Sequence, residues 1–283
     1  VNPRLGHEYE PEYAIKPDVT QKKVMVIGAG PGGLECAISA ARRGHLVTVV
    51  DRKAEVGGQL LSASKEVGGG EVFLKLVDHY KSQIEKFNVN LKLGTEANPK
   101  LCEAEGPDVV VVATGADIVP LSDGVSGKPK VLSAYDVLEK GASCGEKVVV
   151  LGGDRMGLVA SEVLAEQGKT VSVIEEGGRM GSDVIPTWKW RHDKWIKEFS
   201  IQVYTASRVE EISERGVRIK TKEGEETFIE ADTIVQAGPR KAQQDLLGLL
   251  EFSVDELYIV GDALRPRSIH NAIHEGFKVG VRI

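Results

Sequence analysis

Cysteines, aromatic residues and long apolar runs are all scarce in this sequence of 283 residues. The three cysteines, Cys36, Cys102 and Cys144, are odd in number and scattered, which argues against a disulfide framework and favours a reducing, cytoplasmic compartment. No apolar run approaches the roughly twenty residues that a membrane-spanning helix needs, and no signal-peptide core opens the chain. We therefore expect neither a membrane span nor a membrane partner.

Basic residues are also fewer than acidic ones. The chain has 36 Lys and Arg against 42 Asp and Glu, a net charge of -6, whereas a nucleic-acid surface is basic. His270 and His274 lie one helical turn apart, but their order does not match the zinc motif and no third ligand is evident. We expect no nucleic-acid partner and no metal site. The length instead suits about two globular domains.

A glycine-rich turn between two apolar strands is the most informative stretch present. Residues 24–27 are apolar, Gly28, Gly30 and Gly33 follow, and a helix of small residues leads to a strand that ends at Asp51. Gly28 permits the tight turn, Gly30 lets the backbone approach a diphosphate, and Gly33 brings helix against strand. The spacing predicts a βαβ unit that binds a dinucleotide, with the diphosphate at the helix N-terminus and a ribose at Asp51.

A second copy of this pattern follows at one constant offset. The strand 148–151 leads into a glycine-rich turn, a helix and a second strand that ends at an acid. The offset of 124 positions relates Gly152 to Gly28, Gly157 to Gly33, Gly168 to Gly44, and Glu175 to Asp51. A match without gaps over four landmarks indicates a duplicated fold, and therefore a second candidate nucleotide site at Gly152, Gly153, Gly157 and Glu175.

The second turn departs from the first at Asp154, which replaces the middle glycine. A carboxylate about 5 Å from a phosphate costs about 3 kcal/mol at an effective dielectric constant near 20. Arg155 could offset part of this cost, or Asp154 could point away. The sequence therefore leaves two alternatives, a second turn that binds a nucleotide and one that does not. If a nicotinamide nucleotide binds, Glu175 and Glu176 favour NADH over NADPH, and Arg179 is the only nearby cation that favours NADPH.

Three stretches together resemble the flavoproteins with two dinucleotide-binding domains, the superfamily of the disulfide reductases: 28–51, 113–115 and 258–263. The resemblance implies an α/β fold of two Rossmann-like three-layer domains, with the NAD(P)-binding domain inserted into the FAD-binding one, as in glutathione and thioredoxin reductases. The implied domains are an extended lead-in at 1–18, an FAD-binding domain at 19–118 plus 233–283, and an NAD(P)H-binding-like domain at 119–232. The chain has no Cys-x-x-Cys, so disulfide chemistry is not implied.

The resemblance also implies site residues. Gly261 and Asp262 would hold the ribityl and phosphate region of FAD, and backbone N–H groups of 270–273 would lie near the flavin O2 edge. A helix N-terminus at that edge stabilises negative charge. The implied FAD-binding residues are Gly28, Gly30, Pro31, Gly32, Gly33, Asp51, Arg52, Gly58, Gln59, Ala113, Thr114, Gly115, Gly261, Asp262, Asn271, Ala272 and Ile273.

The segments 1–8, 57–59 and 133–138 are similar to the 2,4-dienoyl-CoA reductase, 2-enoate reductase and trimethylamine dehydrogenase group, within the NADH:flavin oxidoreductase family. This narrower resemblance implies that an FMN-bearing barrel and a 4Fe-4S cluster precede this portion, as a fused domain or a separate subunit. Electrons would pass from NADH through FAD to that part, which reduces an activated C=C bond of an enoate or a CoA thioester. No catalytic side chain is implied in this portion, because the flavin performs the hydride chemistry.

Two other functions are compatible with these residues. Relatives of the trimethylamine dehydrogenase kind suggest a non-redox module that holds ADP, and the altered second turn makes that interpretation plausible. A free-standing NADH:flavin diaphorase is the other alternative. The remaining implied partners are a nicotinamide nucleotide and a possible second copy of the chain.

Overall fold

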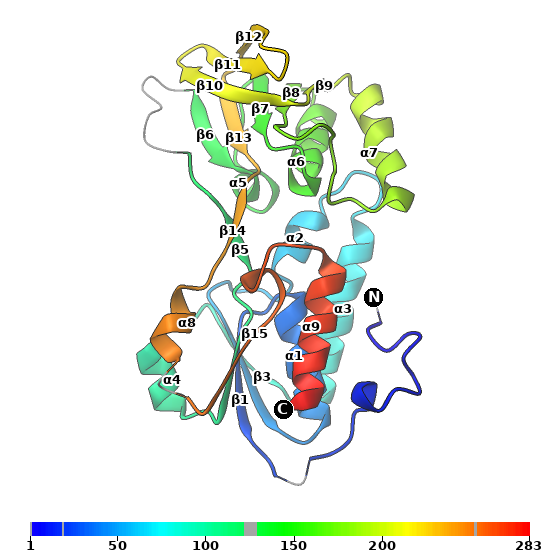
Figure 1. Ribbon diagram of the computed structural model, residues 1–283, viewed down its shortest axis with the longest axis vertical. Helices are drawn as coiled ribbons and strands as arrows, with labels where there is room; N and C mark the ends of the chain where they lie inside the picture. The colour runs from blue at the N-terminus through cyan, green and yellow to red at the C-terminus, as the bar shows by residue number, and fades with distance from the viewer. Residues whose placement is uncertain (1, 19, 122–128, 252–253) are drawn as a thin grey trace. The chain divides into compact units, whose positions relative to one another are not determined.

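The computed structural model describes residues 2–18, 20–121, 129–251 and 254–283, so Val1 of the predicted lead-in lies outside the described residues. The chain divides into two compact units (Figure 1). The first comprises residues 1–61, 72–117 and 241–283, and the second comprises 62–71 and 118–240. Within the described ranges, every helix is too short or too polar to cross a bilayer.

The first unit is built on a parallel sheet of five strands in the order β15-β4-β1-β2-β3. Its strands are short and rich in Val and Ile, and all four residues of β4 are buried, as expected where helices cover both faces. The strands are β1 (Lys23–Ile27), β2 (Leu46–Asp51), β3 (Asn90–Leu93), β4 (Val109–Val112) and β15 (Glu256–Ile259).

Helices cover both faces of this first sheet. One core joins the sheet to α1 (Pro31–Arg42), α3 (Glu71–Lys86) and α9 (Ile269–Arg282). A second core, on the other face, includes residues of α4 (Pro99–Glu105) and α8 (Asp245–Leu250). The short helix α2 (Gln59–Ala63) follows the Gly57–Gly58 turn. The carboxyl ends of the strands and the N-terminus of α1 therefore meet at one edge, where ligands of such sheets bind.

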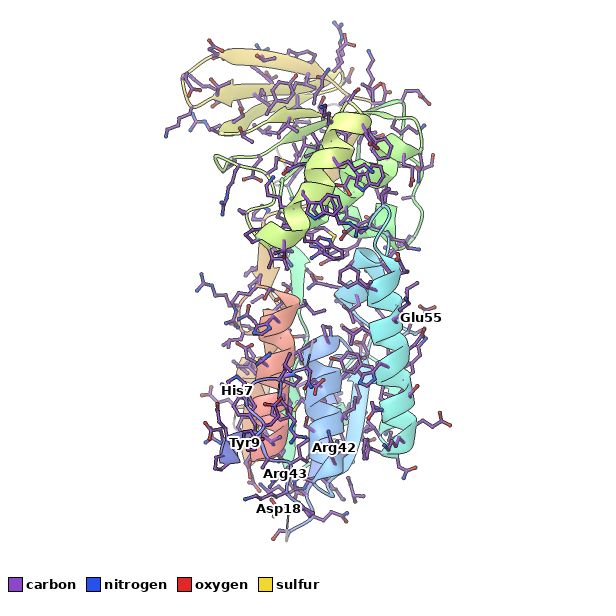
Figure 2. All side chains as sticks on the ribbon, turned by 90° about the vertical axis from the view of Figure 1, so that its right-hand side faces the viewer. His7, Tyr9, Asp18, Arg42, Arg43 and Glu55 are labelled. Carbon is purple, nitrogen blue, oxygen red and sulfur yellow. The ribbon has the colours of Figure 1, made fainter. Side chains whose placement is uncertain are left out.

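The lead-in segment runs along α9 and the end of α1. Its short 3-10 helix η1 (Pro11–Tyr13) buries Tyr13 against Phe277 of α9, with ring centroids 5.7 Å apart. Arg43 fixes the end of the segment, because its guanidinium lies 2.6 Å from the Asp18 carboxylate. Figure 2 labels His7 and Tyr9 of the lead-in, and shows Asp18 near Arg43. The lead-in is thus packed onto the first unit.

The second unit repeats the architecture with a different cover on one face. Its parallel sheet has the order β6-β13-β7-β8-β9. Three helices pack on one face, and an antiparallel three-stranded sheet packs on the other. The elements are β6 (Lys130–Ser133), α5 (Ala134–Leu138), β7 (Lys147–Leu151), α6 (Arg155–Glu166), β8 (Thr170–Ile174), α7 (Pro186–Glu198), β9 (Gln202–Tyr204), β10 (Ser207–Ser213), β11 (Gly216–Thr221), β12 (Glu226–Glu230) and β13 (Thr233–Gln236). The chain passes between the units at β5 (Ala116–Ile118) and β14 (Arg240–Ala242), which pair.

The predicted fold class is confirmed, since the structure is α/β with two parallel sheets. One boundary differs: we placed residues from 233 on in the FAD-binding domain, whereas β13 lies in the second sheet between β6 and β7. The physical reason is burial, because Ile234 and Val235 are fully covered there. The second unit also includes the loop 62–71, which the sequence assigned to the first domain.

Glycines set the close packing of α9 on α1. A Cβ atom at Gly276 would overlap the carbonyl oxygen of Gly32, and one at Gly280 would lie 2.5 Å from the carbonyl oxygen of Cys36. We predict that Gly276→Ala lowers the free energy of unfolding by about 3 kcal/mol, because overpacking against backbone cannot be relieved by a rotamer change. Urea denaturation of the whole chain, followed by circular dichroism, measures this free energy. Gly248→Ala on α8 is the control, since nothing lies within 4 Å of a Cβ there, and an equal loss in both variants would contradict the prediction.

Candidate functional site

At two positions of the first glycine-rich turn, only glycine fits without steric overlap. Gly28 has φ +116°, and a Cβ atom there would overlap the carbonyl oxygen of Ala113. A Cβ atom at Gly33 would overlap the carbonyl oxygen of Gly28 itself. The turn therefore brings α1 directly onto the ends of β1 and β4, as the spacing of the glycines predicts.

The N-terminus of α1, by contrast, opens onto free space. Gly30 is the N-cap residue in an extended conformation, and no atom lies within 4 Å of a Cβ built on it. Gly30 has no side chain to accept a hydrogen bond, and Pro31 at the first helical position has no N–H. The N–H groups that follow are left to a ligand. This is the cradle that a diphosphate requires, so the residues present fit a dinucleotide.

Asp51 stands at the end of β2 with its carboxylate held by the backbone. Its Oδ2 accepts a hydrogen bond from the Ala29 N–H at 2.6 Å, and its Oδ1 accepts one from the Lys53 N–H at 2.7 Å. A carboxylate has about four lone-pair sites, so Asp51 can still accept from a ribose hydroxyl. The neighbouring Arg52 is 59% exposed and lies 3.1 Å from the carboxylate of Asp117.

Residues distant in sequence meet at this turn. A Cβ atom at Gly58 would lie 2.8 Å from the Cα of Gly30, so α2 begins against the turn. The Gln59 amide donates to Asp262 Oδ2 at 3.0 Å, and Asp262 Oδ1 accepts from the Arg267 N–H at 2.9 Å. Gly30, Gly58, Gln59 and Asp262 are therefore brought together within the first unit.

The end of β4 adds Thr114 and Gly115 to the same region. The Thr114 hydroxyl donates to the Gln243 carbonyl at 2.5 Å. Gly115 has φ +78°, and a Cβ atom there would lie 3.9 Å from the Gln59 amide nitrogen. Ala113, one residue earlier, lies under Gly28. All three residues of the predicted Ala113-Thr114-Gly115 stretch thus line the neighbourhood of the first turn.

The N-terminus of α9 lies beside the N-terminus of α1. Ser268 caps α9 through a reciprocal pair of hydrogen bonds with Asn271. The carbonyl oxygen of Ala272 would lie 3.1 Å from a Cβ at Gly32, and its methyl group 3.3 Å from one at Gly261. Ile273 is fully buried in α9. Of the predicted residues here, Asn271 caps the helix with its side chain, and Ala272 lies closest to the turn.

Arg267 and Glu275 form an ion pair at this helix start. The other oxygen of Glu275 accepts from the Gly261 N–H at 2.9 Å, which fixes the turn before Asp262. In the first turns of α9, before Glu275, the rings of His270 and His274 have centroids 4.0 Å apart. Within the part of the chain that the structure describes, no group of three His, Cys, Asp or Glu could hold a metal ion.

The second turn has the same backbone as the first. Gly152 has φ +101°, and a Cβ atom at Gly157 would overlap the carbonyl oxygen of Gly152. Glu175 Oε2 accepts from the Gly153 N–H at 2.5 Å, and its Oε1 accepts from the Gly177 N–H at 2.6 Å. Glu175 therefore takes the place that Asp51 takes in the first unit.

Asp154 does not point away from this second turn. It is the N-cap residue of α6, and its Oδ1 accepts from the Gly157 N–H at 3.1 Å. Burial, reinforced by the nearby charge of Asp183, raises the pKa of the Asp154 carboxyl above its ordinary value. The cation beside Asp154 is Arg240, whose Nε lies 3.5 Å from Oδ2. The side chain of Arg155, which the sequence offered as one way to offset this charge, pairs with Glu66 at 2.6 Å.

Sequence reasoning missed Glu66, Asp183 and Arg240. Glu66 comes from the loop 62–71 and binds both Arg155 and the Trp188 indole N–H. Asp183 accepts from the Arg155 N–H at 2.8 Å. A signal for Asp183 existed, because the offset of 124 aligns it with Gln59, a predicted site residue of the first unit. Arg240 aligns with Ala116, which was not a predicted site residue, so it had no such signal. Glu66 has no such signal, since its contacts depend on how the loop folds.

Comparison with known proteins finds one family model and several named oxidoreductases that are similar to this chain. The model of the family described as "Pyridine nucleotide-disulphide oxidoreductase" matches residues 22–276. The chain is 33% identical over its whole length to an NADH oxidase of Thermoanaerobacter brockii, and 32% identical to a cinnamate reductase of Clostridium sporogenes. It covers 44% and 42% of those proteins. A solved structure of 2-naphthoyl-CoA reductase matches all of the chain with a TM-score of 0.94 and 38% identity.

The chain spans less than half the length of these proteins, including 43% of the naphthoyl-CoA reductase chain. The remainder of each relative lies outside the matched region. The predicted resemblance to the carboxyl-terminal FAD and NAD(P)H part of the enoate reductase group is confirmed, and the family match implies binding of FAD and a nicotinamide nucleotide.

The carboxylate of Glu66 is 1% exposed and is held by Arg155 and Trp188. We predict that Glu66→Ala destabilises the second unit by about 3 kcal/mol, because it leaves the Arg155 cation without its buried partner. Tryptophan fluorescence during urea unfolding reports this, since all three tryptophans lie in α7. Lys65→Ala, an exposed change in the same loop, is the control, and equal unfolding midpoints for both variants would refute the assignment.

Proposed function

We propose that this chain, which belongs to the pyridine nucleotide-disulphide oxidoreductase family, is an FAD-binding oxidoreductase unit that takes electrons from NADH. One observation supports this proposal most. The open N-terminus of α1 and the returning segment at Asp262 meet in the first unit, joined through Gly58 and Gln59. A single extended cofactor needs both places, a helix N-terminus for its diphosphate and a second contact for the rest.

Several of the predicted residues then have a role in holding FAD. Gly28, Gly30 and Gly33 give the diphosphate access to the α1 N–H groups, and Asp51 accepts from the adenosine ribose. Asp262 binds the ribityl region, and the N-terminus of α9 places positive partial charge at the flavin O2 edge. FAD, when bound, supplies hydride acceptance and the release of single electrons. We assign no general acid or base to this chain.

The electron acceptor belongs to a part outside this sequence. We propose an FMN-bearing barrel with a 4Fe-4S cluster, fused or separate, that reduces an activated C=C bond of an enoate or an acyl-CoA. The names of two relatives, a cinnamate reductase and a 2-naphthoyl-CoA reductase, support this substrate class. The carboxylate of Glu175 at the end of β8 supports NADH over NADPH, because it would repel a 2′-phosphate. A cytoplasmic location and a homo-oligomer remain predictions.

The second candidate is a non-redox module that holds ADP in the first unit. The carboxylate of Asp154 at the second turn favours this candidate, because it opposes a nicotinamide nucleotide there. A free-standing diaphorase would need no additional domain.

Visible absorbance of the purified chain separates these functions. We predict a yellow protein whose visible flavin absorbance is bleached by NADH under anaerobic conditions. Reduction by dithionite serves as the control that the flavin is intact. A colourless protein would favour the ADP module, and a yellow protein that dithionite bleaches but NADH does not would refute the electron entry proposed here.

Gly30→Ala tests the diphosphate site directly. The Cβ atom has room and Gly30 has an ordinary φ of -79°, so the variant should fold, but the methyl group fills the space that the diphosphate needs. Losing two charge-assisted hydrogen bonds should weaken FAD binding about a hundredfold. Titration of the apoprotein with FAD measures the affinity. Gly248→Ala serves again as the control, and unchanged affinity in Gly30→Ala would contradict the site.

A further inference from the structure

The two nucleotide-binding turns share a backbone but differ in three side chains. At the offset of 124 positions, Asp154 stands where the first unit has Gly30, Arg155 where it has Pro31, and Asp183 where it has Gln59. Each replacement adds a group to the turn. A carboxylate replaces a hydrogen atom, an N–H replaces a ring nitrogen without one, and a second carboxylate replaces a neutral amide.

The two carboxylates accept hydrogen bonds from backbone N–H groups at the N-terminus of α6. Asp154 Oδ1 accepts from the Gly157 N–H at 3.1 Å, and Asp183 Oδ1 accepts from the Arg155 N–H at 2.8 Å. The other oxygens of both carboxylates face Arg240, at 3.5 Å from Nε for Asp154 and 3.8 Å from Nη2 for Asp183. The Gly157 N–H, which matches the Gly33 N–H of the first turn, is therefore already used by an acid. The Arg155 N–H, which has no counterpart at Pro31, is used by the second acid.

A segment that follows β8 carries Asp183 to this place. The Gly181 N–H donates to the Gly153 carbonyl at 2.7 Å, and the matching bond in the first unit runs from the Gly57 N–H to the Ala29 carbonyl at 2.8 Å. The Met180 side chain packs against Gly153, where a Cβ atom would overlap its sulfur. Residues 180–183 thus lie along the second turn just as 56–59 lie along the first, but they end in a carboxylate.

We propose that Asp154 and Asp183 occupy the diphosphate position of the second nucleotide-binding turn and thereby set the affinity of this unit for a nicotinamide nucleotide. The inference rests on the proposed function, since it concerns the unit through which NADH enters. Two negative charges repel a diphosphate, and their hydrogen bonds leave it fewer donors. The adenosine half keeps its place, because Glu175 is held by the Gly153 and Gly177 N–H groups as Asp51 is held in the first unit.

Calorimetric titration of the FAD-loaded chain with ADP-ribose and with adenosine tests the proposal. We expect Asp154→Gly combined with Asp183→Gln, the residues of the first unit, to bind ADP-ribose about a hundredfold more tightly than the unaltered chain. Adenosine affinity should change by less than threefold. Asp154→Asn with Asp183→Asn removes the charges but keeps the hydrogen-bond acceptors, so it should gain about tenfold and protects the test against misfolding of the first pair.

Glu223→Gln combined with Glu225→Gln, two exposed changes in the turn before β12, is the charge-matched control and should leave ADP-ribose affinity unchanged. The proposal would be overturned if both double variants bound ADP-ribose with an affinity within threefold of that of the unaltered chain. It would also be overturned by an unaltered chain that already binds ADP-ribose a hundredfold more tightly than adenosine.

These outcomes are distinct from failure of the proposed function. A yellow chain that NADH reduces, with ADP-ribose affinity unmoved by the variants, would overturn the present inference alone. A colourless chain would overturn the proposed function. The titrations would then use the same variants, each also carrying Gly30→Ala, so that diphosphate binding at the first turn is weakened.

Discussion

The unsatisfied N–H groups at the start of α1 are the constraint on which the first unit depends. A helix leaves its first N–H groups without partners, and here the N-cap residue is Gly30 and the next is Pro31, so the chain supplies no acceptor of its own at these two positions. Gly28 and Gly33 bring that helix end onto the sheet because a Cβ atom at either would overlap a carbonyl oxygen. The packing of Gly58 and the bond between Gln59 and Asp262 then gather the remaining site residues around it.

The second unit shows that the same backbone can serve a different purpose. Its turn keeps Gly152, whose φ is +101°, and Gly157, where a Cβ atom would overlap a carbonyl oxygen, so the fold is retained. Its N-cap residue is an acid, and a second acid reaches the same helix end from the segment after β8. Fold and ligand affinity are therefore fixed by different positions of one motif. The family match identifies the fold, but only the side chains at the turn indicate how well each unit binds a diphosphate.

Much of the fold could be predicted because its signals are local. Glycine spacing, short apolar strands and an acid at the end of each second strand each depend on residues that are close in sequence. The constant offset also relates β13 to β4, and it would have placed β13 correctly in the second sheet, where Ile234 and Val235 are buried. The pairing of Arg155 with Glu66 could not be predicted, because it joins residues 89 positions apart through a loop without a repeat.

Hydrogen exchange with and without FAD tests the central claim most directly. If one cofactor extends from the α1 N-terminus to the start of α9, FAD should slow exchange at amides of 32–34 and of 262–273 together, and leave those of 155–157 unchanged. Protection of only one of the two stretches, or protection centred on the second turn, would contradict the account.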